Sequence, residues 1–213
     1  MRSMGAIAHF DPSVRATDDG TTSRWVDRIG GNTVTSTSQA SRLVYSSSLA
    51  SLNNRPGWSG TSAANSNLQN TGSTALGLAM AGVLPHTIYT VRRATLTTPS
   101  ICMSSSKSGV TDYWYVGNLS SVNNSAYVRN QAGQTVHTGS YRHTTEAIVA
   151  VATFSGTTAG IHDNGGIALA PTADTKSIDT NNLCIGGLIV GTAVSLCFDG
   201  DFGDIIIFPT AHT

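Results

Sequence analysis

The feature that most constrains this chain is its near-complete lack of lysine and glutamate, two strong helix formers. Among 213 residues there are two lysines, Lys107 and Lys176, and one glutamate, Glu146. Exposed helix faces are normally built from these residues, so the chain lacks the usual material for helices. Serine and threonine account for 54 residues, with 22 glycines and 13 asparagines, which favour strands, tight turns and loops. The composition therefore predicts an all-β protein.

Short apolar segments of strand length recur between turn residues, which is the pattern of a two-sheet antiparallel β-sandwich. We expect strands at residues 6–10, 24–26, 87–93, 100–104, 113–116, 126–129, 145–154 and 204–208. The polar region 46–70 has one strand-like segment, at residues 55–58. At most one short helix is expected, at residues 74–84, because that run is apolar and ends at Pro85. The length fits one sandwich domain over residues 1–213.

The charge of the chain is low and balanced, with twelve basic and twelve acidic residues. Nucleic-acid-binding proteins carry basic stripes, and the only adjacent basic pair here is Arg92-Arg93. Neighbours in a strand point to opposite faces, so we interpret this pair as solvated charge and not as a phosphate clamp. We therefore expect no nucleic-acid partner. No run approaches the roughly 20 apolar residues of a membrane span, so we also expect no membrane insertion.

The three cysteines, Cys102, Cys184 and Cys197, are odd in number and lack Cys-x-x-Cys spacing, which argues against a disulfide framework and a zinc site. Cys184 and Cys197 lie in apolar runs and are predicted to be buried free thiols. Free thiols fit folding in the cytoplasm. The first residues lack the apolar region and cleavage site of a signal peptide, which agrees with this expectation.

The sequence argues against catalysis. Retaining glycosidases need two carboxyl groups about 5–5.5 Å apart, usually glutamates, and this chain has only Glu146. Asp199 and Asp201 can share one strand face, but we interpret them as solvated residues beside a turn. No Gly-x-Ser-x-Gly motif is present, and the one close histidine pair, His137 and His143, is expected at a hairpin surface. We therefore predict a protein that is not an enzyme and needs no cofactor.

A strong hairpin turn is predicted at Asp163-Asn164-Gly165-Gly166, since Asn-Gly tolerates the positive φ of a two-residue turn. Its oxygens are of the kind that calcium prefers, but turn geometry accounts for these residues, so we predict no metal site.

The most aromatic stretch of the chain is the candidate for carbohydrate contact, because sugars need an aromatic platform with amide and hydroxyl groups nearby. In an extended strand Trp114 faces one side and both neighbouring tyrosines face the other. Core packing of Trp114 is the open alternative, and Trp25 and Trp58 are expected in the core. The candidate carbohydrate-binding residues are Tyr113, Trp114, Tyr115, Asn118, Asn123 and Asn124.

Several short motifs follow one another along the chain. They are Phe10-Asp11-Pro12, Trp25-Val26-Asp27, Gly30-Gly31-Asn32, Arg55-Pro56-Gly57-Trp58-Ser59-Gly60, Thr87-Ile88-Tyr89-Thr90-Val91, Phe154-Ser155-Gly156, Asp163-Asn164-Gly165, Ile185-Gly186-Gly187 and Asp204-Ile205-Ile206-Ile207-Phe208. In this order they resemble the signatures of concanavalin A-like/laminin-G-like jelly rolls, particularly those of phage virion proteins. Two positions depart from the family pattern: Ser59 replaces an aspartate, and Asp204 replaces a glutamate.

The resemblance implies a jelly-roll sandwich whose roles range from sugar binding to structural packing. From it we expect a non-enzymatic structural or decoration protein of a phage-like virion, made in the host cytoplasm. Its partners would be capsid or tail proteins, or further copies of itself in a symmetric assembly. The alternative is a carbohydrate-binding module or adhesin that recognises cell-surface glycans. Fold alone does not choose between these roles.

Overall fold

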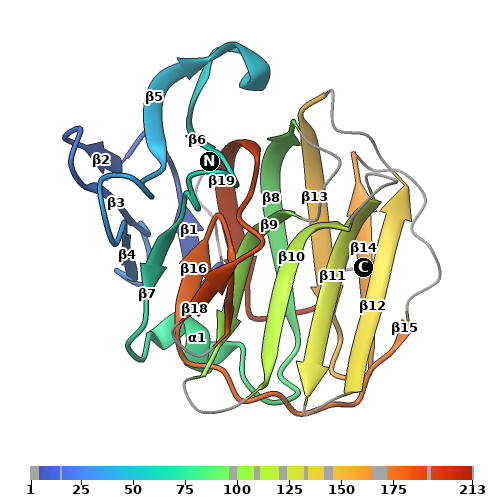
Figure 1. The fold of residues 1–213 in the computed structure, drawn as a ribbon. Helices are drawn as coiled ribbons and strands as arrows, with labels where there is room; N and C mark the ends of the chain where they lie inside the picture. The colour runs from blue at the N-terminus through green and yellow to red at the C-terminus, as the bar shows by residue number, and fades with distance from the viewer. Residues whose placement is uncertain are drawn as a thin grey trace.

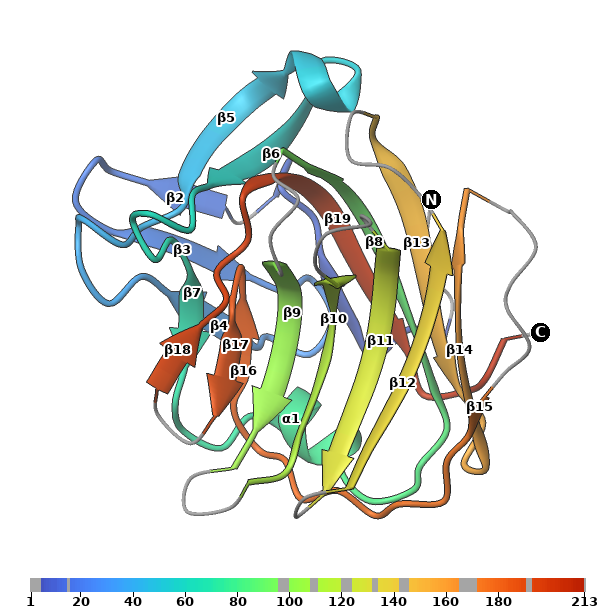
Figure 2. The ribbon, with the colours of Figure 1, turned by 45° about the vertical axis from the view of Figure 1, so that its right-hand side comes forward.

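The computed structural model describes residues 5–14, 16–95, 100–107, 111–119, 124–131, 134–141, 146–164, 172–190 and 193–212. Within these residues the chain forms two large antiparallel sheets that lie face to face (Figures 1 and 2). The predicted all-β sandwich is confirmed, and its physical basis is the alternation of apolar and polar residues along the strands.

The first sheet has eight strands in the described part of the chain. Its order is β15 (Thr172–Ala173), β14 (Thr158–Asp163), β13 (Ile148–Phe154), β8 (His86–Ala94), β19 (Gly200–Phe208), β6 (Arg55–Gly60) and β5 (Val44–Leu49). The eighth strand, β1 (Ala8–Phe10), pairs with β19 outside this path, so segments from the two ends of the chain lie side by side.

The second sheet has nine strands in the same described ranges. Its order is β12 (Gln134–Tyr141), β11 (Asn124–Gln131), β10 (Tyr113–Leu119), β9 (Ser100–Ser106), β16 (Leu183–Ile185), β7 (Leu68–Asn70), β4 (Thr33–Thr35), β3 (Ser23–Val26) and β2 (Ala16–Asp18). A separate hairpin pairs β17 (Leu188–Val190) with β18 (Ala193–Ser195).

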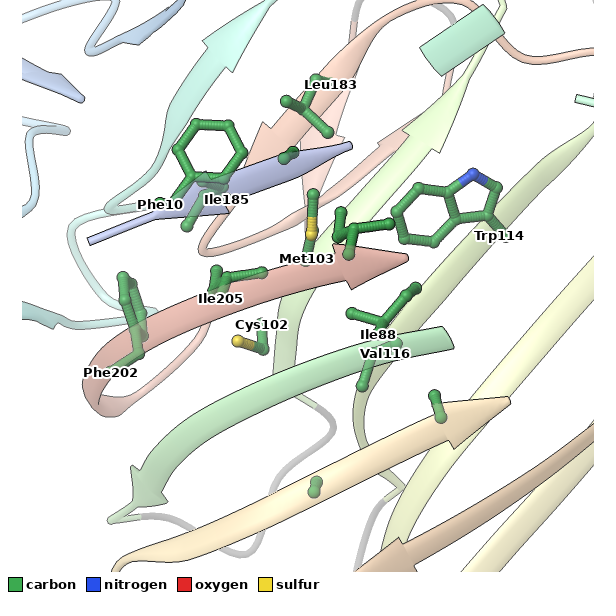
Figure 3. Close-up of a cluster of buried hydrophobic side chains, with 14 of the residues drawn as sticks. Phe10, Ile88, Cys102, Met103, Trp114, Val116, Leu183, Ile185, Phe202 and Ile205 are labelled. Carbon is green, nitrogen blue, oxygen red and sulfur yellow. The ribbon is translucent and has the colours of Figure 1, made fainter. Parts of the chain in front are cut away.

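The main core fills the space between the two sheets (Figure 3). Phe10 packs edge-on against Trp25, and Trp25 contacts Trp58, with ring centroids 5.4 and 5.7 Å apart. Both tryptophans are fully buried, as predicted. All three cysteines are buried and free, and the sequence predicted this burial for Cys184 and Cys197.

The predicted helix is shorter than expected. α1 covers only Ala75–Ala79, and the hydroxyl of Thr74 caps it by accepting from the backbone N–H of Gly77. A Cβ on Gly77 would lie 2.5 Å from the backbone of Asn181, so glycine is needed there for packing. Beyond Met80 the chain turns to form a bridge between Gly82 and Ile178, and this pairing replaces the expected final turn of helix.

The region 46–70 contains more strand than the sequence indicated. Residues 55–58 fall within β6, as predicted, but β5 and β7 flank it, and the 3₁₀ helix η1 (Ala50–Leu52) joins β5 to β6. Asn53 and Asn54, which follow η1, both adopt left-handed backbone conformations, with φ of 55° and 60°. They let the hairpin reverse direction over the edge of the first sheet.

Candidate functional site

The aromatic stretch predicted from the sequence lies on β10, and its alternation is as expected. Trp114 points into the main core and is fully buried, so it has no surface to offer a ligand (Figure 3). Tyr113 and Tyr115 lie on the opposite face, stacked with ring centroids 6.1 Å apart and planes at 19°. The structure therefore supports the alternative in which Trp114 packs in the core.

The tyrosine face of β10 is largely covered. Tyr115 is 6% exposed, packs in a small cluster with Ile101, Val128 and Leu188, and has a pKa raised to about 12 by burial and by Tyr113. The hydroxyl of Ser104 donates to the carbonyl of Gly187, which holds the β17–β18 hairpin against this face. Of the three aromatic candidates on β10, Tyr113 is therefore the one that is half-exposed.

Of the three predicted asparagines, Asn118 alone has a side chain within the described part of the structure. Asn118 is 5% exposed on β10, facing the same side as Trp114. Asn124 lies in β11 opposite Leu119, and only its backbone is described. Asn123 falls outside the described residues.

A more open surface lies on the outer face of the eight-stranded sheet, where β8, β13 and β19 run side by side. Three hollows adjoin there. The first, of about 260 Å³, is lined by Tyr89, Val91, Val149, Asp204, Ile206 and Phe208. The second, of about 510 Å³, shares Val91, Val149 and Asp204 with it and adds Leu52, Asn53, Arg55, Pro56, Ala147, Ile148 and Gly203. The third, of about 520 Å³, is lined by Ala50, Ser51, Asn53, Arg93, Glu146 and Ala147. Because neighbouring hollows share residues, they form one continuous depression, here called the sheet groove.

One end of the sheet groove is aromatic. Tyr89 and Phe208 face each other on neighbouring strands with centroids 5.7 Å apart, and His212 packs on Phe208 at 4.5 Å. The ring nitrogen Nδ1 of His212 lies 2.8 Å from the hydroxyl of Tyr89. This bond fixes the edge of the aromatic group, while the rings of Tyr89 and Phe208 stay half-exposed beside Val149.

The middle of the groove carries a carboxylate. Asp204 lies in β19 where the pairing register with β8 shifts between Phe202 and Ile205, and its side chain is 47% exposed. Its Oδ1 lies 2.8 Å from Nε2 of His9 on β1. The sequence marked position 204 only as a departure from the family pattern, and it gave no sign that residue 9 would be its neighbour.

Asp11, next to His9, is held in a dense set of hydrogen bonds. Its Oδ1 accepts from the backbone and hydroxyl of Ser13 at 2.9 and 2.5 Å, and its Oδ2 accepts from Arg28 at 2.6 Å. Burial acts to raise the pKa of Asp11, but the bonds from Ser13 and Arg28 outweigh burial, so the pKa lies below its usual value. Asp11 is therefore ionised at neutral pH.

The other end of the groove is polar, and the β5–η1–β6 hairpin contributes one side of its lining. Arg93 and Glu146 line the sheet side, and Ser51 and Asn53 line the hairpin side. The Ser51 hydroxyl donates to Asp201 at 2.5 Å, which ties the hairpin to β19. Arg55 is exposed at the junction with the middle of the groove.

Two predictions about charged residues need correction. Asp199 is not solvated but 5% exposed, and it accepts a hydrogen bond from the backbone of Ser62. Arg92 and Arg93 do face opposite sides, but Arg92 is fully buried between the sheets and donates to the carbonyl of Gly117. A strand that faces the core on one side places every second residue inside, and here that rule includes an arginine.

A separate hollow lies on the nine-stranded sheet and has a simpler chemical lining. It measures about 410 Å³ and is lined by Thr33, Thr35, Ser36, Thr37, Gln69, Asn70 and Thr71. These residues offer hydroxyl and amide groups but no aromatic ring and no charge.

No helix in the described ranges is long and apolar enough to cross a membrane.

Comparison with known proteins identifies the fold. No protein-family model matches the chain, and no curated protein sequence matches it. Among solved structures, the CBM40 domain of the Ruminococcus gnavus IT-sialidase, bound to α2,3-sialyllactose, superposes with a TM-score of 0.53 at 14% identity, covering 68% of this chain and 88% of that one. The NanB sialidase of Streptococcus pneumoniae gives 0.53 at 15% identity, covering 68% of this chain but 25% of its own. The leech intramolecular trans-sialidase gives 0.51 at 16% identity, with 69% and 26% covered. At these identities the likeness concerns the fold alone, and this chain has the concanavalin A-like jelly-roll fold that its sequence motifs resemble.

Proposed function

We propose that this protein is a carbohydrate-binding module and that the sheet groove is its glycan site. The observation that carries the proposal is the combination within one groove of an exposed aromatic surface, at Tyr89 and Phe208, with a carboxylate, at Asp204. Binding sites for small molecules are concave and mostly apolar, with a few polar groups that fix orientation. The sheet groove has this composition, whereas the threonine-rich hollow has no apolar platform.

The chemistry of a sugar matches the two sides of this groove. The C–H-bearing face of a pyranose ring stacks on half-exposed aromatic rings such as Phe208 and Tyr89. The hydroxyls of the same ring are donors for Asp204 and Asn53 and acceptors for the guanidinium of Arg55. The groove continues past the size of one ring toward Arg93 and Glu146, so we propose an oligosaccharide as the ligand.

The fold supports the same proposal. The CBM40 domain that superposes on this chain is a carbohydrate-binding module and was solved with sialyllactose, an acidic glycan. Sialylated and neutral oligosaccharides are therefore the two ligand classes to compare. Arg55 and Arg93, near the hairpin end of the groove, would favour the acidic class, and Glu146 would oppose it.

The experiment is a glycan array with purified protein, followed by calorimetric titration of the glycans retained. We expect Phe208→Ala to weaken binding about tenfold or more, since it removes half of the stacking surface. The matched control is Tyr113→Ala, a half-exposed tyrosine on the opposite sheet, which should bind as the wild type does. Retention of no glycan at millimolar sugar would refute the proposal, and loss of binding in Tyr113→Ala alone would move the site to β10.

We further propose that the module binds glycans without cleaving them. The chain has a single glutamate, Glu146, and two aspartates close together at the start of β19, Asp199 and Asp201, accept hydrogen bonds from Ser62, Ser51 and Ser59. Incubating the retained glycan with the protein and analysing it by mass spectrometry tests this, because any shortened product would contradict the proposal.

The virion role expected from the sequence stays a prediction, as do capsid, tail or self-assembly partners. The structures compared above are sialidases or a sialidase domain, so they favour glycan binding. Purified particles with and without the protein would test the virion role. The two roles are compatible when a glycan-binding module is carried on a particle surface.

A further inference from the structure

Three metal-ligating side chains from distant parts of the sequence meet at the rim of the sheet groove. His9 and Asp11 come from β1 and the residue that follows it, and Asp204 comes from β19. One ligand atom from each, a ring nitrogen and two carboxylate oxygens, all lie within 4.8 Å of one another. We propose that these residues bind a divalent transition-metal ion, with zinc as the reference ion.

The distances need only small adjustments to hold an ion. Two ligand atoms on a tetrahedral zinc ion lie about 3.3 Å apart, given bonds near 2.0–2.2 Å. His9 Nε2 and Asp204 Oδ1 are now 2.8 Å apart, so the ion would enter by separating this hydrogen-bonded pair slightly. The remaining distance is at most about 1.5 Å, and Asp204, whose side chain is 47% exposed, would close it by moving toward Asp11, which Ser13 and Arg28 hold in place.

The surroundings of Asp11 fit the role of an outer layer around a metal ligand. Ligating carboxylates are themselves hydrogen-bonded, and these outer bonds fix their orientation. The backbone N–H and the hydroxyl of Ser13 use both lone pairs of Oδ1, whereas Arg28 uses one lone pair of Oδ2, so the second lone pair of Oδ2 is the one that can face an ion. Arg28 offsets one of the two carboxylate charges, which lowers the affinity for a cation without removing a ligand.

The ligand set selects the type of ion. One imidazole nitrogen with two carboxylate oxygens suits zinc, manganese and related ions, whereas calcium prefers six to eight oxygens. The protein supplies three ligands, and Asp204 is 47% exposed toward the groove, so a further position stays open to water. Catalytic and substrate-binding zinc sites share this three-plus-one arrangement. On the proposed function, that open position would accept a sugar hydroxyl.

The test is calorimetric titration of zinc chloride into protein that has been treated with chelator and dialysed. We expect one ion per chain with micromolar affinity, weakened at least tenfold in both His9→Gln and Asp204→Asn. The matched control is His162→Gln, an exposed histidine on β14 of the same sheet, which should bind zinc as the wild type does. Manganese should broaden the amide signals of residues 8–11 and 204–206 in NMR spectra, which places the ion.

A charge variant separates a metal site from a purely structural ion-pair cluster. Arg28→Gln removes the positive charge beside Asp11 and should tighten zinc binding several-fold, most clearly at low salt. Absence of binding at millimolar zinc, or equal binding in wild type and Asp204→Asn, would refute the site. These titrations contain no glycan, so they test the metal site independently of the proposed function. The glycan array, repeated with and without chelator, then shows whether the ion contributes to sugar binding.

Discussion

His86 should make the stability of this protein depend on pH in a way that one substitution removes. His86 is 1% exposed on β8, with its ring against Phe154 and Tyr127. Its Nδ1 lies 3.0 Å from the carbonyl of Leu84, and its Nε2 lies 2.6 Å from the Tyr127 hydroxyl. A neutral ring satisfies both contacts, since Nδ1–H donates to the carbonyl and Nε2 accepts from the hydroxyl.

The magnitude follows from the pKa. Burial, together with the positive charge of Arg129, lowers the pKa of His86 from 6.5 to about 3. Below pH 6.5 the unfolded chain binds a proton at this residue, whereas the folded protein does not until about pH 3. Unfolding is therefore increasingly favoured as the pH falls through this window, by up to about 1.4 kcal/mol per pH unit. Between pH 7 and pH 5 the loss amounts to about 2 kcal/mol.

The assay is urea unfolding of the wild type and of His86→Gln at pH 7 and pH 5. The variant is less stable at pH 7, but it lacks the titrating group, so the gap between the two proteins should narrow by about 2 kcal/mol at pH 5. His162→Gln, an exposed histidine, should follow the wild type. Parallel loss of stability in wild type and His86→Gln would refute the reasoning. If His86→Gln does not fold, the ring signals of His86 in the wild type should show no titration between pH 8 and pH 4, and a midpoint near 6.5 would refute it equally.

Three further predictions concern the core and the backbone. Trp114→Ala removes a fully buried side chain and should cost about 3–5 kcal/mol in thermal unfolding, and a loss under about 1 kcal/mol would contradict its core position. Arg129→Met leaves Asp174 buried without its partner and should cost about 3–5 kcal/mol, a loss that Asp174→Asn in the same chain should partly restore. Gly200→Ala would place a Cβ 2.0 Å from a carbonyl oxygen of β8 at a φ of 144° and should abolish soluble expression. Gly31→Ala, at a φ of 71° with open space around it, should cost only about 1–2 kcal/mol, and equal effects of the two glycine variants would show that the close contact is not decisive.

The local part of this structure was predictable from the sequence. Scarce lysine and glutamate, abundant serine and threonine, and apolar runs of strand length indicated an all-β sandwich. The same patterns placed Trp25 and Trp58 in the core and predicted that Cys184 and Cys197 are buried. The motif order pointed to the correct fold. These properties depend on composition and on alternation along a strand, which neighbouring residues determine.

Contacts between distant residues could not be predicted in this way. The helix expected at 74–84 is shorter because the chain beyond Met80 turns and Gly82 pairs with Ile178, and Arg92 is buried because the opposite sheet covers its face of β8. Neither Ile178 nor the β10 carbonyl that accepts from Arg92 is near these residues in sequence.

The sequence alone indicated the all-β class and many of the strands, and the tertiary structure decided which strand surfaces face solvent together. From the sequence, the tyrosines of β10 were candidates for contact with a sugar. In the structure the β17–β18 hairpin, about 70 residues later in the chain, covers much of their face. The sheet groove instead joins side chains from β8, β13, β19 and the β5–β6 hairpin, and its rim pairs His9 with Asp204. Such a surface depends on the order of strands across a sheet, and hydrogen bonding between strands sets that order over separations that no local pattern records.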